Sequence, residues 1–210
     1  MPSHGPVTRD LLQTFEDVRS RLFARLEGLT DTEYLWQPVP NTHSNSESHS
    51  TSASTSASAS ASASASPSAS ASDCMTVRAA PDGVFRADPR PPRSTTRPLV
   101  TTIAWRTWHI GADCLRGYLR FFDPDIEPPT DRHLWPGTAD EGIRTLADDW
   151  KTFNSHIAAL GDQRLLEPMG PHTGAFAHES YLLLALHALD EAAHHGGELG
   201  LLRDLYLRAT

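Results

Sequence analysis

The sequence predicts an all-α protein, a four-helix bundle with long loops between its helices. Four long segments place apolar residues three or four positions apart, which is the spacing of an amphipathic helix. They cover about residues 7–29, 101–122, 139–160 and 180–210. The stretches between them are rich in proline and glycine, and only one short stretch has a β-like pattern. Helices with one apolar face bury it against one another, so a bundle is the expected architecture.

The first predicted helix, over residues 7–29, has one apolar and one charged face. Thr8 is the expected N-cap and Gly28 marks the end. Pro38 and Pro40 in the following stretch, LTDTEYLWQPVP, favour extended chain and stop any helix. The residues expected to be buried are Leu11, Leu12, Phe15, Val18, Leu22, Phe23, Leu26 and Leu29.

Residues 44–72 form an insert of alternating serine and alanine. Such side chains bury too little apolar area to offset the entropy of ordering the chain. We therefore predict a disordered low-complexity insert with no catalytic part, inside a single domain that covers residues 1–210. His43 and His49 lie at the edge of this insert and are not expected to bind metal.

A small hairpin or irregular flap is expected between the first and second helices. Residues 74–78 are β-like, Pro81-Asp82-Gly83 is a turn signal, and Val84-Phe85 follows. Either Thr101 or Thr102 can then cap the second helix. Its expected buried stripe is Ile103, Ile110, Cys114, Leu115, Tyr118 and Phe122, with Trp105 and Trp108 in the core or in the wall of a cleft.

The third helix, at about residues 139–160, and the proline-free terminal segment, residues 180–210, complete the predicted bundle. Apolar residues spaced for burial in the third helix are Ile143, Leu146, Trp150, Phe153, Ile157 and Leu160. Proline-rich and glycine-rich loops precede both helices, at about residues 123–138 and 167–177. These are the long crossovers of the predicted fold.

Composition and charge exclude several classes of function. The net charge is -8, and no basic run is interleaved with aromatic residues, which argues against nucleic acid as a partner. Neither a signal-peptide pattern nor an apolar run of membrane-spanning length is visible. Two cysteines are too few for a disulfide framework or a cysteine-based zinc site. We expect a cytoplasmic protein that acts on a small molecule.

The terminal segment contains His187, Glu191 and His195, each four residues from the next. On a helix they lie along one face, and imidazole nitrogen and carboxylate oxygen are ligands for a divalent metal. His109 in the second helix is the candidate third ligand, since bundles build metal sites from facing helices. Three protein ligands leave a position for water or substrate, as in catalytic zinc sites.

Other sets of ligands are compatible with the same spacing. Asp190 and His194 form a rival pair in the adjacent register, and His187 could join Glu191 and His195. Cys114 lies on the predicted buried stripe, which favours an inert core thiol over a nucleophile. The histidines could equally be structural.

Two stretches, WRTWHIGADCLRGY and HALDEAAHHGGELGLLRDLY, resemble the DinB/YfiT-like superfamily of metal-dependent enzymes. LTDTEYLWQPVP and MTVR, before PDGVF, resemble one branch of it. The resemblance implies a four-helix bundle with metal ligands at His109, Glu191 and His195. Many members have histidine where this chain has Glu191, and a His/Glu/His set resembles the zinc-dependent, mycothiol-dependent maleylpyruvate isomerases. The Ser/Ala insert departs from the family pattern.

The resemblance implies an enzyme that uses a divalent metal, zinc first and nickel or iron as alternatives. Its reaction would be thiol-dependent S-transfer or isomerisation with a low-molecular-weight thiol, and several relatives are homodimers. A metal-hydroxide hydrolase and a non-catalytic bundle that binds metal or a ligand are the competing hypotheses.

Overall fold

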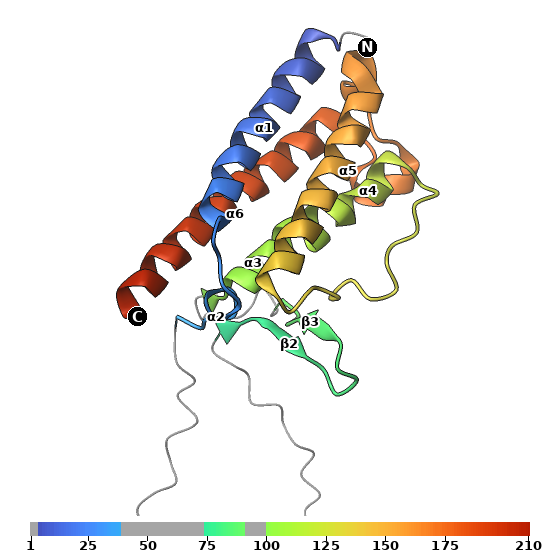
Figure 1. The fold of residues 1–210 in the computed structure, drawn as a ribbon. Coiled ribbons are helices and arrows are strands. Elements are labelled where there is room, and N and C mark those ends of the chain that lie inside the picture. The colour runs from blue at the N-terminus through green and yellow to red at the C-terminus, as the bar shows by residue number, and fades with distance from the viewer. Residues whose placement is uncertain (1–3, 39–73, 91–99) are drawn as a thin grey trace, which may run out of the picture.

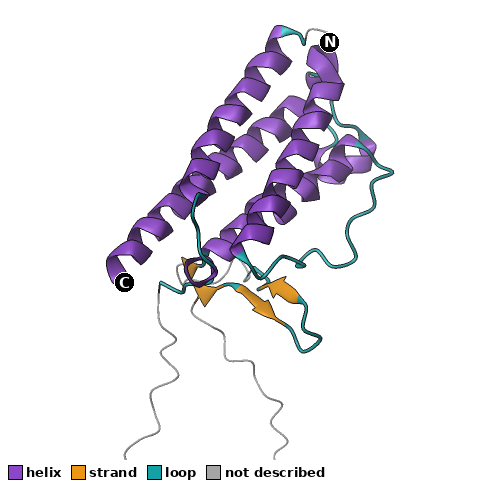
Figure 2. Cartoon of the chain, in the orientation of Figure 1, coloured by secondary structure: helices purple, strands orange, loops and turns teal. Residues whose placement is uncertain are grey.

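The computed structural model describes residues 4–38, 74–90 and 100–210, and most of these residues are helical. The long helices lie side by side, with the short strands gathered at one end (Figures 1 and 2). The helical elements are α1 (Pro6–Leu26), α2 (Asp31–Tyr34), α3 (Ile103–Trp108), the π-helix η2 (His109–Arg116), α4 (Gly117–Phe122), α5 (Ala139–Leu165), the 3-10 helix η3 (Pro171–Phe176) and α6 (Tyr181–Ala209). The prediction of a mainly helical protein is confirmed.

The start of α1 differs from the prediction. The N-cap is Gly5, followed by Pro6 at the first helical position, so the expected cap at Thr8 is wrong. The carboxylate of Asp162 instead accepts hydrogen bonds from the backbone N–H groups of Val7 and Thr8, at 3.1 and 2.8 Å. It also accepts one from Thr8 Oγ1 at 2.6 Å. Two backbone N–H groups of the first turn, which lack a partner within the helix, are thus satisfied by a residue of α5 that no local pattern could reveal.

The short helix α2 was not expected from the sequence. Thr30 caps it by accepting a hydrogen bond from the backbone N–H of Glu33 at 3.2 Å. Asp31 accepts a hydrogen bond from the backbone N–H of Ala139 at 2.7 Å, and this contact ties α2 to the first turn of α5. Pro38 lies after α2, so it limits the helix without preventing it.

The predicted hairpin is present. Strands β2 (Val77–Ala79) and β3 (Phe85–Ala87) pair antiparallel, with Arg78 opposite Arg86. A parallel pair, β1 (Cys74–Met75) with β4 (Val100–Thr101), was not predicted. Thr102 then caps α3 by accepting a hydrogen bond from the Trp105 backbone N–H. The predicted disordered insert, His43 and His49 lie outside the described residues.

The second predicted helix, residues 101–122, is present but contains a π-helical stretch, η2, between α3 and α4. In α5, Gly161 has a φ of 67°, so the regular helix predicted over residues 139–160 is followed by a kinked turn. Helix α6 is continuous, and Ser180 caps it through the Leu183 backbone N–H. The loop predicted at about residues 167–177 includes the short helix η3.

Aromatic residues fill the space where α1, α5 and the α3–η2–α4 segment meet. Phe15 of α1 contacts Trp150 and Phe153 of α5, with ring centroids 5.9 and 5.7 Å apart. Trp105 and Trp108 are also fully buried, which confirms that they belong to the core. Helix α3 and the π-helix η2 also pack against α6, and the candidate site lies where they meet.

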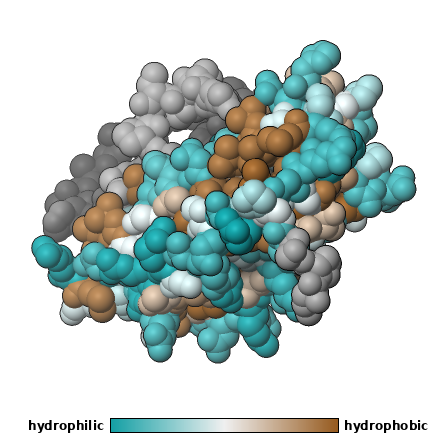
Figure 3. Space-filling view, turned by 90° about the horizontal axis from the view of Figure 1, so that it is seen from above, coloured by the Kyte–Doolittle hydropathy of each residue, from teal (hydrophilic) through white to brown (hydrophobic). Residues whose placement is uncertain are grey.

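The molecular surface mixes polar and apolar groups. Seen from above the orientation of Figure 1, apolar residues lie among hydrophilic ones on this face (Figure 3). Of the described helices, none combines the length and the apolar character that a membrane span requires.

Candidate metal centre

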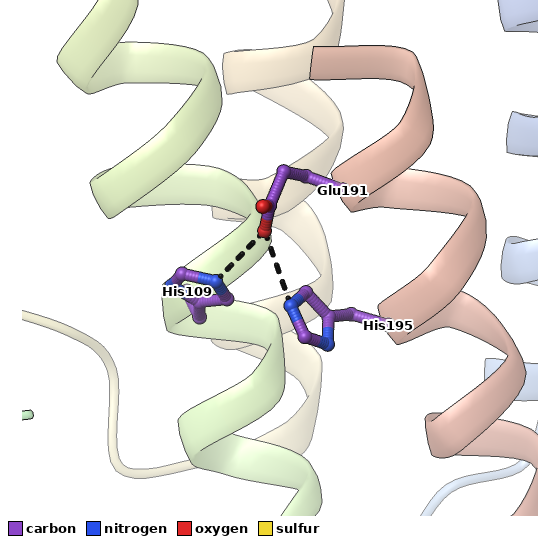
Figure 4. Close-up of side chains that lie close together, drawn as sticks. All are labelled: His109, Glu191 and His195. Carbon is purple, nitrogen blue, oxygen red and sulfur yellow. Dashed lines mark hydrogen bonds and ion pairs between the residues drawn. The ribbon is translucent and has the colours of Figure 1, made fainter. Parts of the chain in front are cut away.

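The three residues predicted to bind metal come together between η2 and α6 (Figure 4). Nε2 of His109 and Nε2 of His195 each lie 3.1 Å from Oε2 of Glu191. One ligand atom from each residue can be chosen so that all lie within 4.8 Å of one another. Both histidines are buried, and the Glu191 side chain is 27% exposed. A ligand could therefore reach this group from the Glu191 side.

The local structure explains how these side chains meet. His109 is the first residue of η2, and its ring stacks on Trp105, with centroids 5.4 Å apart and an interplanar angle of 19°. Trp105 is itself held by a hydrogen bond from Nε1 to the carbonyl oxygen of Asp88 at 2.8 Å. Glu191 and His195 are four residues apart on α6, one turn of the helix. π-Helical turns occur frequently at functional sites.

Each histidine is supported by a second carboxylate at its other ring nitrogen. His109 Nδ1 lies 3.0 Å from Asp113 Oδ2, and His195 Nδ1 lies 2.6 Å from Glu198 Oε2. A proton on Nδ1 that is donated to a carboxylate leaves the Nε2 lone pair free, as in carboxylate–histidine–zinc sites. In that tautomer both Nε2 atoms and Glu191 Oε2 are acceptors that converge with no hydrogen between them. Such a set fits a cation.

The spacing of the acceptors also agrees with a zinc site. Ligand atoms about 2.0–2.1 Å from a tetrahedral zinc ion lie roughly 3.3 Å apart. The two printed N–O separations of 3.1 Å are close to that value.

The electrostatics favour the metal-binding protonation states. Burial lowers the pKa of His195, which favours the neutral imidazole that binds metal. Burial alone would raise the pKa of Glu191, but the neighbouring His109 and His195 outweigh it and the net shift is downward. Burial alone would also raise the pKa of Asp113, but its hydrogen bond with His109 outweighs this effect, so the net pKa shift is downward. Both carboxylates are therefore charged at neutral pH.

The alternative ligands are placed less favourably. The His187 side chain is 52% exposed, and its Nε2 lies 3.9 Å from Glu191 Oε1 while its ring stacks on Tyr118. The His194 side chain is 64% exposed and lies 3.5 Å from Glu198. His194, His195 and Glu198 form a second group of suitable ligand atoms. This group would use Glu198, the carboxylate that supports His195 in the first group. The Asp190–His194 pair is exposed on the helix surface.

Sequence reasoning missed several charged residues around the site. Glu198 follows His195 by three positions, so helical spacing alone could have indicated it. Arg106, which lies 2.8 Å from Glu198, carries no such signal because buried and exposed arginines look alike in a sequence. Arg90 comes from the loop after β3, and its Nη2 lies 3.0 Å from His109 Nε2. Only the three-dimensional structure brings it to the site.

The two cysteines are not candidates for nucleophilic catalysis. Cys114 is buried, and burial raises its pKa well above the usual range. Cys74 is also buried, and burial raises its pKa to about 11. A reactive thiol at this site would therefore have to come from another molecule.

The fold and the site define a helical protein with a candidate metal centre between two of its helices. Residues 14–199 match the family described as the DinB superfamily, and this chain belongs to it. The match contains His109, Glu191 and His195. Comparisons with curated proteins and with solved structures gave no significant match.

Proposed function

We propose that this protein is a metal-dependent enzyme in which His109, Glu191 and His195 bind one divalent ion, most favourably zinc. The observation that carries the proposal is the convergence of two supported Nε2 atoms on one carboxylate oxygen. Membership of the DinB superfamily, a family associated with metal binding, also supports it. The helices would then form the four-helix bundle typical of this family, with the Ser/Ala insert in the loop between its first and second helices.

We further propose that the reaction is thiol-dependent S-transfer or isomerisation with a low-molecular-weight thiol. A bound metal would supply a Lewis acid that holds the thiol as thiolate and lowers its pKa. The resemblance of the His/Glu/His set to mycothiol-dependent isomerases supports this reaction, and the buried cysteines of the chain leave the thiol to a cosubstrate. In S-transfer a sulfur–carbon bond forms, and the leaving group departs with its electron pair.

The residues of the chain have distinct roles in this proposal. His109 and His195 present Nε2 to the metal because Asp113 and Glu198 hold their Nδ1 protons. Glu191 supplies one negative charge and leaves part of its side chain accessible. Trp105 limits the movement of the His109 ring and excludes water from one side of it. A cytoplasmic location and a homodimer remain predictions, and light scattering tests the second.

The experiment uses cobalt(II) as a spectroscopic substitute in the purified, untagged protein. Thiolate binding to cobalt produces a sulfur-to-metal charge-transfer band in the near ultraviolet. We expect this band on titration with glutathione, cysteine or another small thiol, and its loss in His109→Ala. Cobalt uptake without such a band, combined with pH-dependent ester hydrolysis, would instead identify a hydrolase. Absence of cobalt uptake would leave a non-catalytic helical protein.

A further inference from the structure

Arg106 is a buried cation whose hydrogen bonds are not satisfied by the protein. Its residue is 7% exposed, and its Nε is buried without a hydrogen-bond partner. Nε does lie 2.8 Å from Glu198 Oε2, so the two groups form an ion pair without an aligned N–H. Among the described residues, its other recorded contact is with the ring of Trp105, 5.4 Å from the guanidinium carbon. Leaving even one guanidinium donor unpaired inside a protein is unfavourable.

A second guanidinium reaches the same place from a different element. Arg90 Nη2 lies 3.0 Å from His109 Nε2, the atom proposed to bind metal. A lone pair on that nitrogen cannot accept a hydrogen bond and bind a metal at once. Metal binding would therefore release the Arg90 N–H for another acceptor at the edge of the site.

Both guanidiniums lie beside the candidate metal centre, Arg90 against His109 and Arg106 against Glu198. Burial is the main cause of the lowered pKa of Arg106, and the positive charge of Arg90 contributes to it. Two like charges that converge beside a divalent cation are unfavourable, and an anion between them would relieve the repulsion. The planar fork of a guanidinium matches a carboxylate in geometry.

We infer that Arg90 and Arg106 bind a carboxylate group of the substrate beside the metal centre. A carboxylate suits this place better than a doubly charged phosphate, since Asp113, Glu191 and Glu198 already bring three negative charges to it. This inference rests on the proposed function and narrows the electrophile to an organic acid. The two arginines would hold the acid group beside the candidate metal centre, since Arg90 contacts His109 and Arg106 contacts Glu198.

Calorimetric titration of the zinc-loaded protein with benzoate and with benzamide tests the inference. The two probes have nearly the same shape and differ in charge. We expect benzoate to bind and benzamide to bind at least about tenfold more weakly, since charge-assisted hydrogen bonds are worth about 1.5–3 kcal/mol. Arg90→Gln and Arg106→Gln should each weaken benzoate binding by a similar factor. Arg120→Gln is the control, because Arg120 is exposed on α4 and packs on Phe121.

Metal content, measured on every variant, separates this inference from the proposed function. Loss of benzoate binding with one zinc ion retained supports the role of the arginines. Equal binding of benzoate and benzamide, no benzoate binding to the zinc-loaded protein, or benzoate binding that survives both arginine substitutions would overturn it. If Arg106→Gln fails to fold, two other variants still test the inference. Arg106→Lys keeps the positive charge but lacks the planar fork that pairs with a carboxylate. Arg90→Gln changes a residue in an exposed loop. A wild type that binds neither zinc nor nickel nor iron would refute the proposed function.

Discussion

The Tyr34 cluster and the candidate metal centre are two of the buried polar groups in the described part of the chain, and their hydrogen bonding differs. The Tyr34 cluster consists of Tyr34, Thr107 and Trp135. Trp135 Nε1 donates to Tyr34 Oη at 2.9 Å and to Thr107 Oγ1 at 3.2 Å. Tyr34 Oη donates to the carbonyl oxygen of Pro136, and Thr107 Oγ1 donates to that of Ala104. Every donor in this cluster has an acceptor within the protein.

The candidate metal centre is different, because converging acceptors and a buried unpaired donor remain there. His109 and His195 direct Nε2 to the same oxygen of Glu191, while Arg106 Nε is buried with no hydrogen bond. Structural polar clusters are stable when all members are satisfied, and partly satisfied ones are costly. The Tyr34 cluster therefore stabilises the fold, whereas the second group leaves a buried donor that the protein itself does not satisfy.

The largest effect on the Tyr34 cluster is expected from Gly142→Ala. A Cβ added at Gly142 would collide with Tyr34 Oη, and the tight cluster leaves it little room to move. We expect the free energy of unfolding to fall by about 1–3 kcal/mol, as for other overpacked interiors. Gly197→Ala is the matched control: no heavy atom lies within 4 Å of its added Cβ, so it should stabilise α6 by up to about 1 kcal/mol. Equal stability of the two variants in chemical denaturation would contradict the closed packing.

Asp113→Asn should act on the metal centre instead. The neutral amide supports the His109 Nδ1 proton less well, and we expect zinc affinity to fall about 10–100-fold. The unfolding free energy of the metal-free protein should change by less than about 1.5 kcal/mol. Competition with a chromophoric chelator measures the affinity. Asp190→Asn, on the exposed face of α6, should leave it unchanged; a similar loss in both variants would argue against a specific role for Asp113.

Tyr34→Phe tests whether the Tyr34 cluster and the candidate metal centre are independent of each other. The substitution removes one of the two acceptors of Trp135 Nε1, while the other, Thr107 Oγ1, remains. We therefore expect the free energy of unfolding to fall by about 0.5–1.5 kcal/mol. Burial raises the pKa of Tyr34 to about 12, and the loss should therefore be constant through the neutral pH range. Zinc affinity should not change. A Tyr34→Phe protein with weakened zinc binding would show that the two groups are coupled.

The smallest effect is expected from Asp162→Asn at the exposed start of α1. Hydrogen bonds from the Thr8 side chain and backbone lower the pKa of Asp162 in the folded protein. Its stabilising contribution is therefore complete above the ordinary aspartate pKa of about 3.9 and is lost as pH falls through the lower folded value. Wild type should be more stable than the variant at pH 7, and the difference should disappear in acid. A pH-independent difference in melting temperature would contradict this assignment.

Local patterns predicted the long helices, the hairpin and the Glu191–His195 pair, whereas His109 was predicted because bundles build metal sites from facing helices and because the sequence resembles the DinB/YfiT-like superfamily. Apolar spacing located the helices, and the i, i+4 spacing of Glu191 and His195 placed both on one face. Features that depend on distant contacts were missed. Asp162 of α5 accepts the hydrogen bonds at the start of α1, and Arg90 reaches His109 from a loop. The π-helical turn at His109 also left no recognisable sequence signal.

Zinc titration of the untagged protein tests the central claim most directly. The wild type and the variants His109→Ala, His195→Ala and His187→Ala would be compared, with His187 as the control because it lies on the same helix outside the group. We predict one tightly bound zinc ion per chain in the wild type and in His187→Ala, and none in the other two variants. Failure of the wild type to bind zinc, nickel or iron, or equal binding by all four proteins, would contradict the account.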